Sequence, residues 1–356
     1  MIGKINSINF KLKVGSKKGQ NRLLRLHLNE SSVDLPPYLK HEILARLKDL
    51  DWHRYQEENP ELLAKLAKDY RLKPGNVLIG NGSNDLIFNL INTFGQSGLI
   101  VLFRPSFSVY SKMAQTLGKR FIEIPINLEK GYEIDLNPRI LAEASLIFID
   151  SPNNPGGFTV HPQKLREILD QSQGLVVVDE AYAEFSEASF ANWVPRYGNL
   201  TIIRTFSKAF RLAGVRFGYL IGQKKVIEKL RSSRPPFAVG IFPQIVANVV
   251  LDNKQVIMKQ IEEIKSERTR VFNQLKKSNL FSPLPSLANF LLIKSHRLSN
   301  RHIFRELRER GILVRIFDLP ELRPFFRVTV GTREENDFFL KALSEIEKEK
   351  GYGSSG

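Results

Sequence analysis

The sequence predicts an α/β protein with a large domain, built on a mostly parallel central sheet covered by helices, and a smaller α+β domain. Between residues 76 and 222, short β-branched runs alternate with helical patterns, as expected for a sheet that is buried on both faces. After Leu251 a long charged helical segment precedes a second group of strands. We therefore assign 40–250 to the large domain, 1–39 and 251–352 to the small domain with an N-terminal arm, and 353–356 to a flexible tail.

The individual elements follow from hydrophobic periodicity. Residues 76–80 form an apolar run that predicts a strand, and the next segment predicts a helix because its apolar residues recur on one face. Further strands are predicted at 99–103, 120–126, 145–150, 174–180, 200–206 and 217–222. In the small domain a charged helix is predicted at 254–278, followed by apolar runs at 289–295 and 325–332 with a helical pattern between them.

Composition excludes several classes of function. The chain has 356 residues, of which 42% are hydrophobic and none is cysteine, so disulfides, thiolate metal sites and cysteine nucleophiles are excluded. No apolar run reaches the roughly 18 residues that a membrane span needs. The first residues lack a continuous apolar segment, and we expect a cytoplasmic protein. The six histidines share no metal-site spacing, and we expect no metal.

The formal net charge of +16 raises the question of nucleic acid as a partner. However, lysines and arginines are spread from Lys4 to Lys350 rather than gathered in one basic tract. We therefore expect no nucleic-acid or membrane partner. A generally basic surface also suits a small anionic substrate, and we expect a small-molecule substrate.

Polar clusters follow five of the predicted strands. They occupy 81–84, 104–107, 151–155, 179–182 and 205–208. In an open parallel sheet, ligands bind at the carboxyl ends of the strands. The five clusters are therefore expected to form one shared site.

One cluster is typical of a phosphate site. The segment "GNGSND" (80–85) ends a strand and opens a helix, so its free backbone N–H groups and the helix dipole suit an anion. The same residues also make an ordinary helix cap. Ser207 and Arg216 favour the phosphate interpretation, because a hydroxyl and a guanidinium are natural further ligands.

Two further clusters supply a carboxylate and an amine. Asp179 ends a predicted buried strand, where a carboxylate is costly without a positive partner; it is either a structural cap or ion pair, or the counter-ion of a protonated cofactor nitrogen. Lys208 is either a solvated loop residue or a Schiff-base nucleophile. Together, a phosphate cradle, a buried carboxylate and a lysine at adjacent strand ends indicate pyridoxal 5′-phosphate.

The motifs of this chain resemble those of the fold-type I pyridoxal-phosphate aminotransferases. The resemblance extends over roughly 26–337 and is greatest for the histidinol-phosphate aminotransferases of histidine biosynthesis. It rests on "LHLNES", "GNGSND", "RPSFSVY", "SPNNPGG", "DEAYAEF", "TFSKAFRLAGVRFGY" and "FRVTVGTREEN". A fold-type I large domain and transaminase activity are what the resemblance implies.

The resemblance also implies a role for each residue that matches a motif. Lys208 would bind the cofactor covalently and move a proton on the substrate, and Asp179 would keep the ring nitrogen protonated. Asn154 and Tyr182 would contact the phenolic oxygen, and Phe107 would stack on the ring. The phosphate would be held by Gly82, Ser83, Asn84, Ser207 and Arg216.

Substrate and partner assignments follow in the same way. Arg327, assisted by Arg315, would anchor the anionic end of histidinol phosphate or glutamate. Tyr55 would reach the phosphate of a neighbouring subunit's cofactor, which implies a homodimer with shared sites. Two alternatives remain, a lyase similar to threonine-phosphate decarboxylases and an aromatic or broad-range aminotransferase.

This chain departs from the family pattern near the substrate. The entry motif of the family usually continues with Asn-Pro-Tyr, where this chain has Ser31-Ser32-Val33. Gln56-Glu57 replaces the usual Pro-Asp, and Arg211 stands where a small residue is common. These departures concern the choice of substrate rather than the cofactor.

Overall fold

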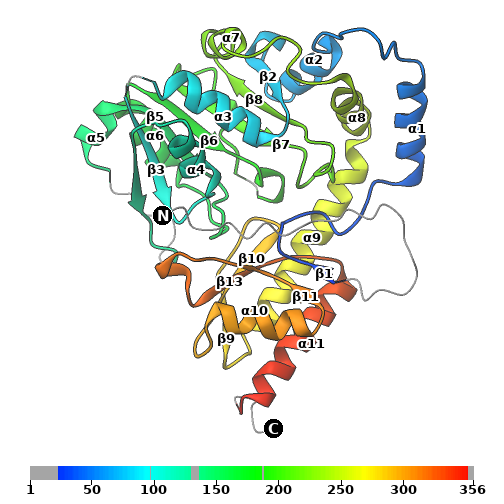
Figure 1. The fold of residues 1–356 in the computed structure, drawn as a ribbon, viewed down its shortest axis with the longest axis vertical. Helices are drawn as coiled ribbons and strands as arrows, with labels where there is room; N and C mark the ends of the chain where they lie inside the picture. Colours follow the sequence, from blue (N-terminus) through cyan, green and yellow to red (C-terminus); the bar gives the residue numbers. More distant parts are fainter. Residues whose placement is uncertain (1–22, 97, 130–135, 187, 352–356) are drawn as a thin grey trace.

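The computed structural model of the chain describes residues 23–96, 98–129, 136–186 and 188–351. Most of the predicted N-terminal arm, before Leu23, and the predicted tail at 353–356 lie outside these residues. Figure 1 shows a larger unit around strands β2 to β8 and a smaller one around β9 to β13, with helix α9 running between them.

The larger unit is built on a seven-stranded sheet with the order β2-β8-β7-β6-β5-β3-β4. Strand β8 runs antiparallel to β2 and β7, whereas the other neighbouring strands are parallel. The predicted mostly parallel sheet is therefore confirmed. The strands are β2 (Val77–Gly80), β3 (Leu99–Arg104), β4 (Phe121–Pro125), β5 (Ala144–Asp150), β6 (Leu175–Asp179), β7 (Leu200–Thr205) and β8 (Gly218–Gly222).

Helices cover both faces of this sheet. Successive side chains of each strand point to opposite faces, so a strand that is apolar throughout must be covered on both. In β5, Ile147 and Ile149 belong to one apolar core, whereas Leu146 and Phe148 belong to the other. The first core includes residues of α1 (Pro37–Lys48), α2 (Pro60–Lys68), α5 (Pro138–Glu143), α6 (Pro162–Gln171) and α8 (Ile241–Asp252). The second includes residues of α3 (Ser83–Phe94), α4 (Val109–Thr116) and α7 (Lys224–Ser232).

The smaller unit contains a four-stranded antiparallel sheet with the order β12-β13-β10-β9. A two-stranded parallel pair, β1 with β11, joins the N-terminal segment to it. The strands are β1 (Leu24–Arg25), β9 (Phe281–Pro283), β10 (Phe290–Ser295), β11 (Ile312–Leu313), β12 (Arg315–Ile316) and β13 (Phe325–Thr329), and the helices are α9 (Lys254–Leu275), α10 (Asn300–Glu309) and α11 (Arg333–Glu349). Short 3₁₀ turns lie at Pro74–Asn76, Ala183–Phe185, Ala191–Trp193 and Pro320–Leu322.

Helix α9 contributes to the cores of both units. Ile257 and Ile261, near its start, pack with the larger unit, and Val271 and Leu275, near its end, pack with the smaller one. The helix thereby ties the small sheet to the large one. The sequence-based boundary at 250 falls inside α8, four residues before α9 begins at Lys254.

The carboxyl ends of five strands of the large sheet lie at one edge. Because β2 and β7 are both antiparallel to β8, they run in the same direction as each other. The polar clusters after β2, β3, β5, β6 and β7 therefore share that edge. The fold thus assembles side chains that are up to 127 residues apart in the chain, from Asn81 to Lys208.

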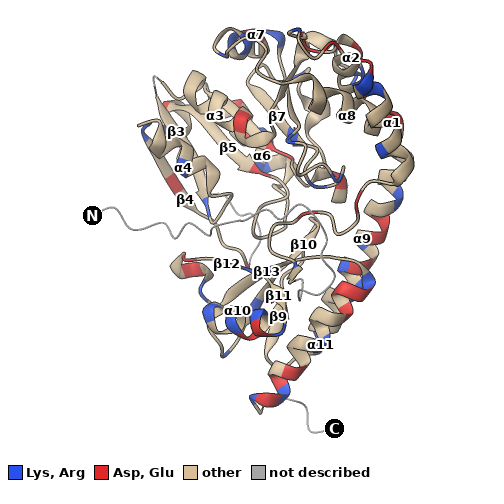
Figure 2. Ribbon diagram, turned by 45° about the vertical axis from the view of Figure 1, so that its right-hand side comes forward, with Lys and Arg blue, Asp and Glu red and all other residues tan. Residues whose placement is uncertain are grey.

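Charges of both signs are interspersed along the helices. In Figure 2, blue and red segments alternate along α9 and α11, and Lys265 with Glu262 and Arg270 with Glu267 form ion pairs one turn apart. Among the helices that the structure describes, none is long and apolar enough to cross a membrane.

A buried ion-pair network lies beneath the polar edge of the sheet. Arg204 on β7 contacts Glu180 at 2.6 Å and Glu184 at 2.9 Å, and its side chain is only 7% exposed. Glu180 also accepts hydrogen bonds from Ser189 and from the backbone N–H of Phe190. The network joins the turn that follows Asp179 to strand β7, and the turn that carries Lys208 comes directly after β7.

Replacement of Arg204 tests this network. Arg204→Met leaves two buried carboxylates without their cation, so we expect the free energy of unfolding to fall by about 3–5 kcal/mol. Arg120→Met is the control, because the Arg120–Glu143 pair is long (3.8 Å) and its side chains are 75% and 64% exposed; we expect a loss below about 1 kcal/mol. Urea unfolding of the cofactor-free proteins measures both, and equal losses would contradict the network.

Candidate active site

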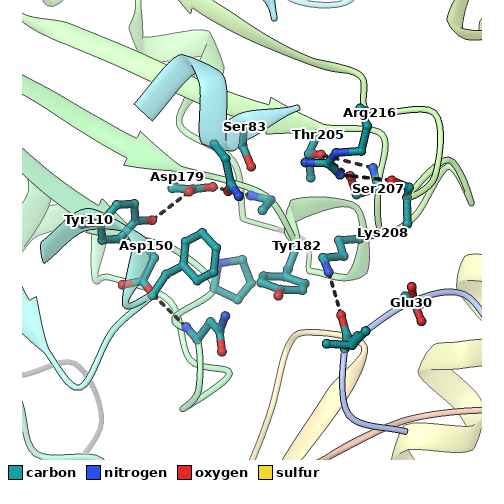
Figure 3. Close-up of a pocket in the computed structure, with 17 residues that line it drawn as sticks. Glu30, Ser83, Tyr110, Asp150, Asp179, Tyr182, Thr205, Ser207, Lys208 and Arg216 are labelled. Atoms are coloured by element: carbon teal, nitrogen blue, oxygen red, sulfur yellow. Dashed lines mark hydrogen bonds between the residues drawn. The ribbon is translucent and has the colours of Figure 1, made fainter. Parts of the chain in front are cut away.

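Two adjoining cavities open at the polar edge of the large sheet. The first has a volume of about 250 Å³ and the second about 660 Å³. Both are lined by Phe107, Asn154, Tyr182 and Lys208, so these side chains stand between the two. Figure 3 shows that the labelled residues of the first cavity come from separate elements and face a common space.

Lys208 lies in the turn after β7 and is half-buried. Its Nζ donates a hydrogen bond to the backbone oxygen of Leu28 at 2.9 Å. Burial lowers the pKa of Lys208 to about 8, and the nearby positive charge of Arg327 acts in the same direction. About a tenth of the amine is therefore neutral at pH 7, far more than for an ordinary lysine, and the neutral form is the nucleophile.

Asp179 is the last residue of β6 and is 3% exposed. Its carboxylate accepts hydrogen bonds from the Tyr110 hydroxyl at 2.7 Å and from the backbone N–H of Ala181 at 3.0 Å. Burial raises the pKa of Asp179 to about 6. At neutral pH the group is mostly ionised, and it offers a negative charge to a cation in the cavity.

Part of the wall of the first cavity is rich in donors. Gly82 precedes α3 with a φ of 76°, and a Cβ there would come within 2.6 Å of Nη2 of Arg216. Ser83 and Asn84 form the first turn of α3 and line the cavity. The Ser207 hydroxyl accepts hydrogen bonds from Thr205 and, at 3.4 Å, from Arg216, so its own proton is free to be donated.

Asn154 and Tyr182 point unused donors toward the same cavity. Arg327 donates a hydrogen bond to Oδ1 of Asn154; because a guanidinium only donates, the Nδ2 group must face the other way. The Tyr182 oxygen accepts a hydrogen bond from Nδ2 of Asn29 at 2.9 Å, which leaves the hydroxyl proton available. Each of the two residues therefore presents one unused donor to the cavity.

The remaining predicted residues fall in different places. Phe107 lines both cavities and packs edge-on against Tyr110, with ring centroids 5.6 Å apart. Arg315 and Arg327 line the second cavity only, with Arg315 exposed and Arg327 buried. Tyr55 lines neither cavity; it is 84% exposed and stacks on Phe237.

The donor set of the first cavity fits pyridoxal phosphate. Ser83, Ser207 and Arg216, together with the N-terminus of α3, match a phosphate. The Asp179 carboxylate matches a protonated ring nitrogen, and the free protons of Asn154 and Tyr182 match an oxygen anion. Gly82 leaves room for the Arg216 guanidinium, since a side chain at position 82 would displace it.

Several residues of the site were given no role from the sequence. Tyr110 and Asn29 each contact a predicted residue, as described above, and Thr205 accepts from the backbone N–H of Ser207. Asp150 lines the first cavity beside Asp179. Two of these residues could have been found from the sequence. Tyr110 lies three residues after Phe107, and Asp150 is the polar residue that ends an apolar strand.

The entry segment is held by a network specific to this sequence. Arg211, with a φ of 63°, donates hydrogen bonds to Oε1 of Gln260 and to the backbone oxygen of Asp34. Gln260 in turn donates to the Ser31 hydroxyl at 3.0 Å. Val33 is 41% exposed and, like Ser31 and Ser32, is outside the described lining of both cavities. Arg211 therefore ties the altered segment to α9.

Comparison with known sequences places the chain among transaminases. The model of the family "Aminotransferase class I and II" matches residues 21–343. A histidinol-phosphate aminotransferase of Pyrococcus furiosus is 39% identical over 333 residues, which are 92% of this chain and 94% of that protein. Another from Carboxydothermus hydrogenoformans is 37% identical over 327 residues, which are 91% and 93% of the two chains.

Solved structures share the fold. A histidinol-phosphate aminotransferase of Clostridium acetobutylicum gives a TM-score of 0.83 at 24% identity and covers 92% of this chain and 100% of that one. That of Sinorhizobium meliloti, in complex with pyridoxal-5′-phosphate, gives 0.81 at 23% and covers 92% of each. An L-threonine-O-3-phosphate decarboxylase of Porphyromonas gingivalis gives 0.79 at 20% and covers 92% and 100%. The fold alone therefore does not choose between these activities.

The lowered pKa of Lys208 predicts how the apoprotein takes up its cofactor. Since only the neutral amine attacks a carbonyl, the rate of covalent uptake of pyridoxal phosphate should rise with pH with a midpoint near 8. Stopped-flow absorbance measures this rate, and Lys208→Arg should abolish covalent uptake. A midpoint near the ordinary lysine value, about 10.4, would show that the amine is not desolvated.

Proposed function

The chain belongs to the class I and II aminotransferases, which are pyridoxal-phosphate-dependent transaminases, and from this premise we propose a specific reaction. The proposed reaction converts histidinol phosphate and 2-oxoglutarate to imidazole-acetol phosphate and L-glutamate. The relatives that are 37–39% identical over nine-tenths of the chain carry the name of this activity. We also propose that the enzyme works in the cytoplasm, which cell fractionation tests.

The composition of the second cavity is the observation that carries this proposal. Arg327 and Arg315 stand in its wall together with Lys208. Burial lowers the pKa of Arg327 to about 10, yet the group remains charged at neutral pH. Its Nη1 and Nη2 atoms each make one hydrogen bond, to Asn154 and to the backbone oxygen of His27, and because each carries a second N–H the guanidinium keeps donors for an anion. A substrate with a phosphate or a carboxylate near its amine suits this arrangement.

The residues of the first cavity then have separate tasks. When bound, pyridoxal phosphate supplies an electrophilic carbonyl and a ring that withdraws electrons from the substrate α-carbon. Lys208 is suited to accept and return a proton at that carbon, because a general base works best with a pKa near the operating pH. Asp179 holds a proton on the ring nitrogen by its negative charge, and Arg327 orients the substrate.

A set of half-reactions tests the proposed substrate. Holoenzyme mixed with histidinol phosphate should lose the absorbance of the lysine-bound cofactor, and 2-oxoglutarate should restore it. Arg327→Gln should lower kcat/KM by about 10²-fold or more, since a buried charged contact is lost. L-Threonine phosphate and aromatic amino acids are the comparison substrates. Release of carbon dioxide from L-threonine phosphate, without reaction of histidinol phosphate, would assign the enzyme to the decarboxylases instead.

We further propose that the protein is a homodimer. Exposed aromatic side chains gather where the segment after α1 meets the start of α8: Trp52 packs edge-on against Phe242, and Tyr55 stacks on Phe237. These four side chains are 41–84% exposed. Paired exposed aromatics of this kind favour burial by another protein surface, and a partner subunit there would bring Tyr55 near a neighbouring site.

Sedimentation of variants tests the homodimer. Trp52→Glu should weaken dimerisation at least about tenfold, because a charge would have to be desolvated at the centre of the patch. Phe338→Glu is the control: Phe338 is 47% exposed and lies on α11, at the opposite end of the molecule from α2 (Figure 1). If the wild-type protein sediments as a monomer at micromolar concentration, or if both variants behave alike, the proposed surface is wrong.

A further inference from the structure

A second carboxylate lies beside Asp179 on the floor of the first cavity. Asp150 ends β5, and the two aspartates are register partners on adjacent parallel strands. Each continues the same face of the sheet, since Leu146 and Phe148 on β5 and Leu175 and Val177 on β6 all belong to one apolar core. Register partners on one face are about 5 Å apart, and Figure 3 shows both aspartates at the cavity.

The hydrogen bonds of Asp150 reach two different loops. The Ser106 hydroxyl, in the loop after β3, donates to Oδ1 at 3.1 Å. Nδ2 of Asn153, in the loop after β5, donates to the same oxygen at 3.0 Å, and the backbone N–H of Asn154 donates to Oδ2 at 2.8 Å. One buried carboxylate therefore joins the two loops that approach the cavity from neighbouring strands.

This position is costly for a carboxylate. Asp150 is 3% exposed and lies beside the carboxylate of Asp179. Burial, and to a smaller extent the charge of Asp179, raise the pKa of Asp150 to about 7, although its three hydrogen-bond donors act in the opposite direction. An apolar residue would avoid that cost, because it would continue the face formed by Leu146 and Phe148. The carboxylate is therefore expected to serve the site rather than the fold.

The two loops carry residues that face the cofactor. Phe107 follows Ser106 directly, so the hydrogen bond from Ser106 to Asp150 fixes the backbone position of Phe107, whose ring lines the cavity. Asn154 is held at both ends, its backbone by Asp150 and its side-chain oxygen by Arg327. With both ends fixed, the free Nδ2 group of Asn154 has one direction left, toward the cavity.

We propose that Asp150 is a positioning residue that fastens the 105–107 loop to the 151–157 loop and so aims Phe107 and Asn154 at the cofactor. The inference rests on the proposed role of Asn154 as a donor to the cofactor oxygen. It does not depend on which amino acid the enzyme transaminates. It assigns no proton transfer to Asp150.

The variant Asp150→Asn removes a hydrogen-bond acceptor without changing the size of the side chain. The amide keeps the size of the side chain and one acceptor for Ser106 and Asn153, but its NH₂ group would face the backbone N–H of Asn154, which now lies 2.8 Å from Oδ2. Two donors cannot pair, and turning the amide over would bring its NH₂ group against Nδ2 of Asn153 instead, so the loop that carries Asn154 loses a bond in either orientation. The dissociation constant of pyridoxal phosphate from the apoprotein should rise about tenfold, within the range for an unsatisfied buried donor.

A second readout reports on Asn154 itself. A donor to the cofactor oxygen stabilises its anionic form, so displacement of Asn154 should raise the pH midpoint of the absorbance change of the bound cofactor. The expected rise is about half a pH unit or more, the equivalent of one modest hydrogen bond. Ser106→Ala, which keeps the carboxylate and the tie to Asn154, should weaken cofactor binding less and leave the midpoint in place.

Asn199→Ala controls for general destabilisation. Asn199 also ties two segments, through bonds from Nδ2 to the backbone oxygens of Leu169 and Ser172 at 3.0 Å, but at the other edge of the sheet. It should lower the melting temperature and leave both cofactor readouts unchanged. Asp150→Asn with wild-type affinity and midpoint would overturn the proposal, as would equal effects of Asn199→Ala. If the wild-type enzyme does not react with histidinol phosphate, the proposed substrate is wrong, but cofactor affinity and the pH midpoint still test the role of Asp150.

Discussion

The removal of charged groups from water at the carboxyl edge of the large sheet is the constraint on which the site depends. Burial raises the pKa of Asp179 and lowers that of Lys208, so both pKa values lie closer to neutral pH than those of ordinary side chains. Neither group is fully neutralised by the fold. Asp179 accepts hydrogen bonds from a hydroxyl and a backbone N–H rather than from a cation. A positively charged ring nitrogen would supply the opposite charge that the carboxylate lacks.

The packing of the fold explains how such groups are kept in place. Arg204 neutralises Glu180 and Glu184 beneath the same edge, so the turn that follows Asp179 is joined to β7, the strand that precedes Lys208. Helix α9 shares residues with both cores and keeps Arg327, from the small sheet, in contact with Asn154, from the large one. In the proposed reaction, the anionic end of the substrate and its reacting amine would thereby be held at a set separation.

Most of the fold and of the candidate site were predictable from local signals. Apolar runs located the strands of the large sheet, the polar clusters after them named Lys208 and Asp179, and the segment just before β8 named Arg216. The antiparallel direction of β8 carried no such signal, because a strand buried on both faces reads alike in either direction. Tyr110 was assigned no role because its partner Asp179 is 69 residues away in the chain. Asp150 was assigned none because its bond to the other loop goes to Ser106, which is 44 residues away.

By itself the sequence determined which chemical groups are present and on which strand ends they stand, since periodicity and residue type are local properties. Only the tertiary structure decided which groups are buried, which donors are already used and which remain free. Asn154 is the clearest case: its free Nδ2 group depends on Arg327, which lies 173 residues further along the chain. Hydrogen-bond direction and desolvation arise from contacts between distant segments, and no short motif encodes them.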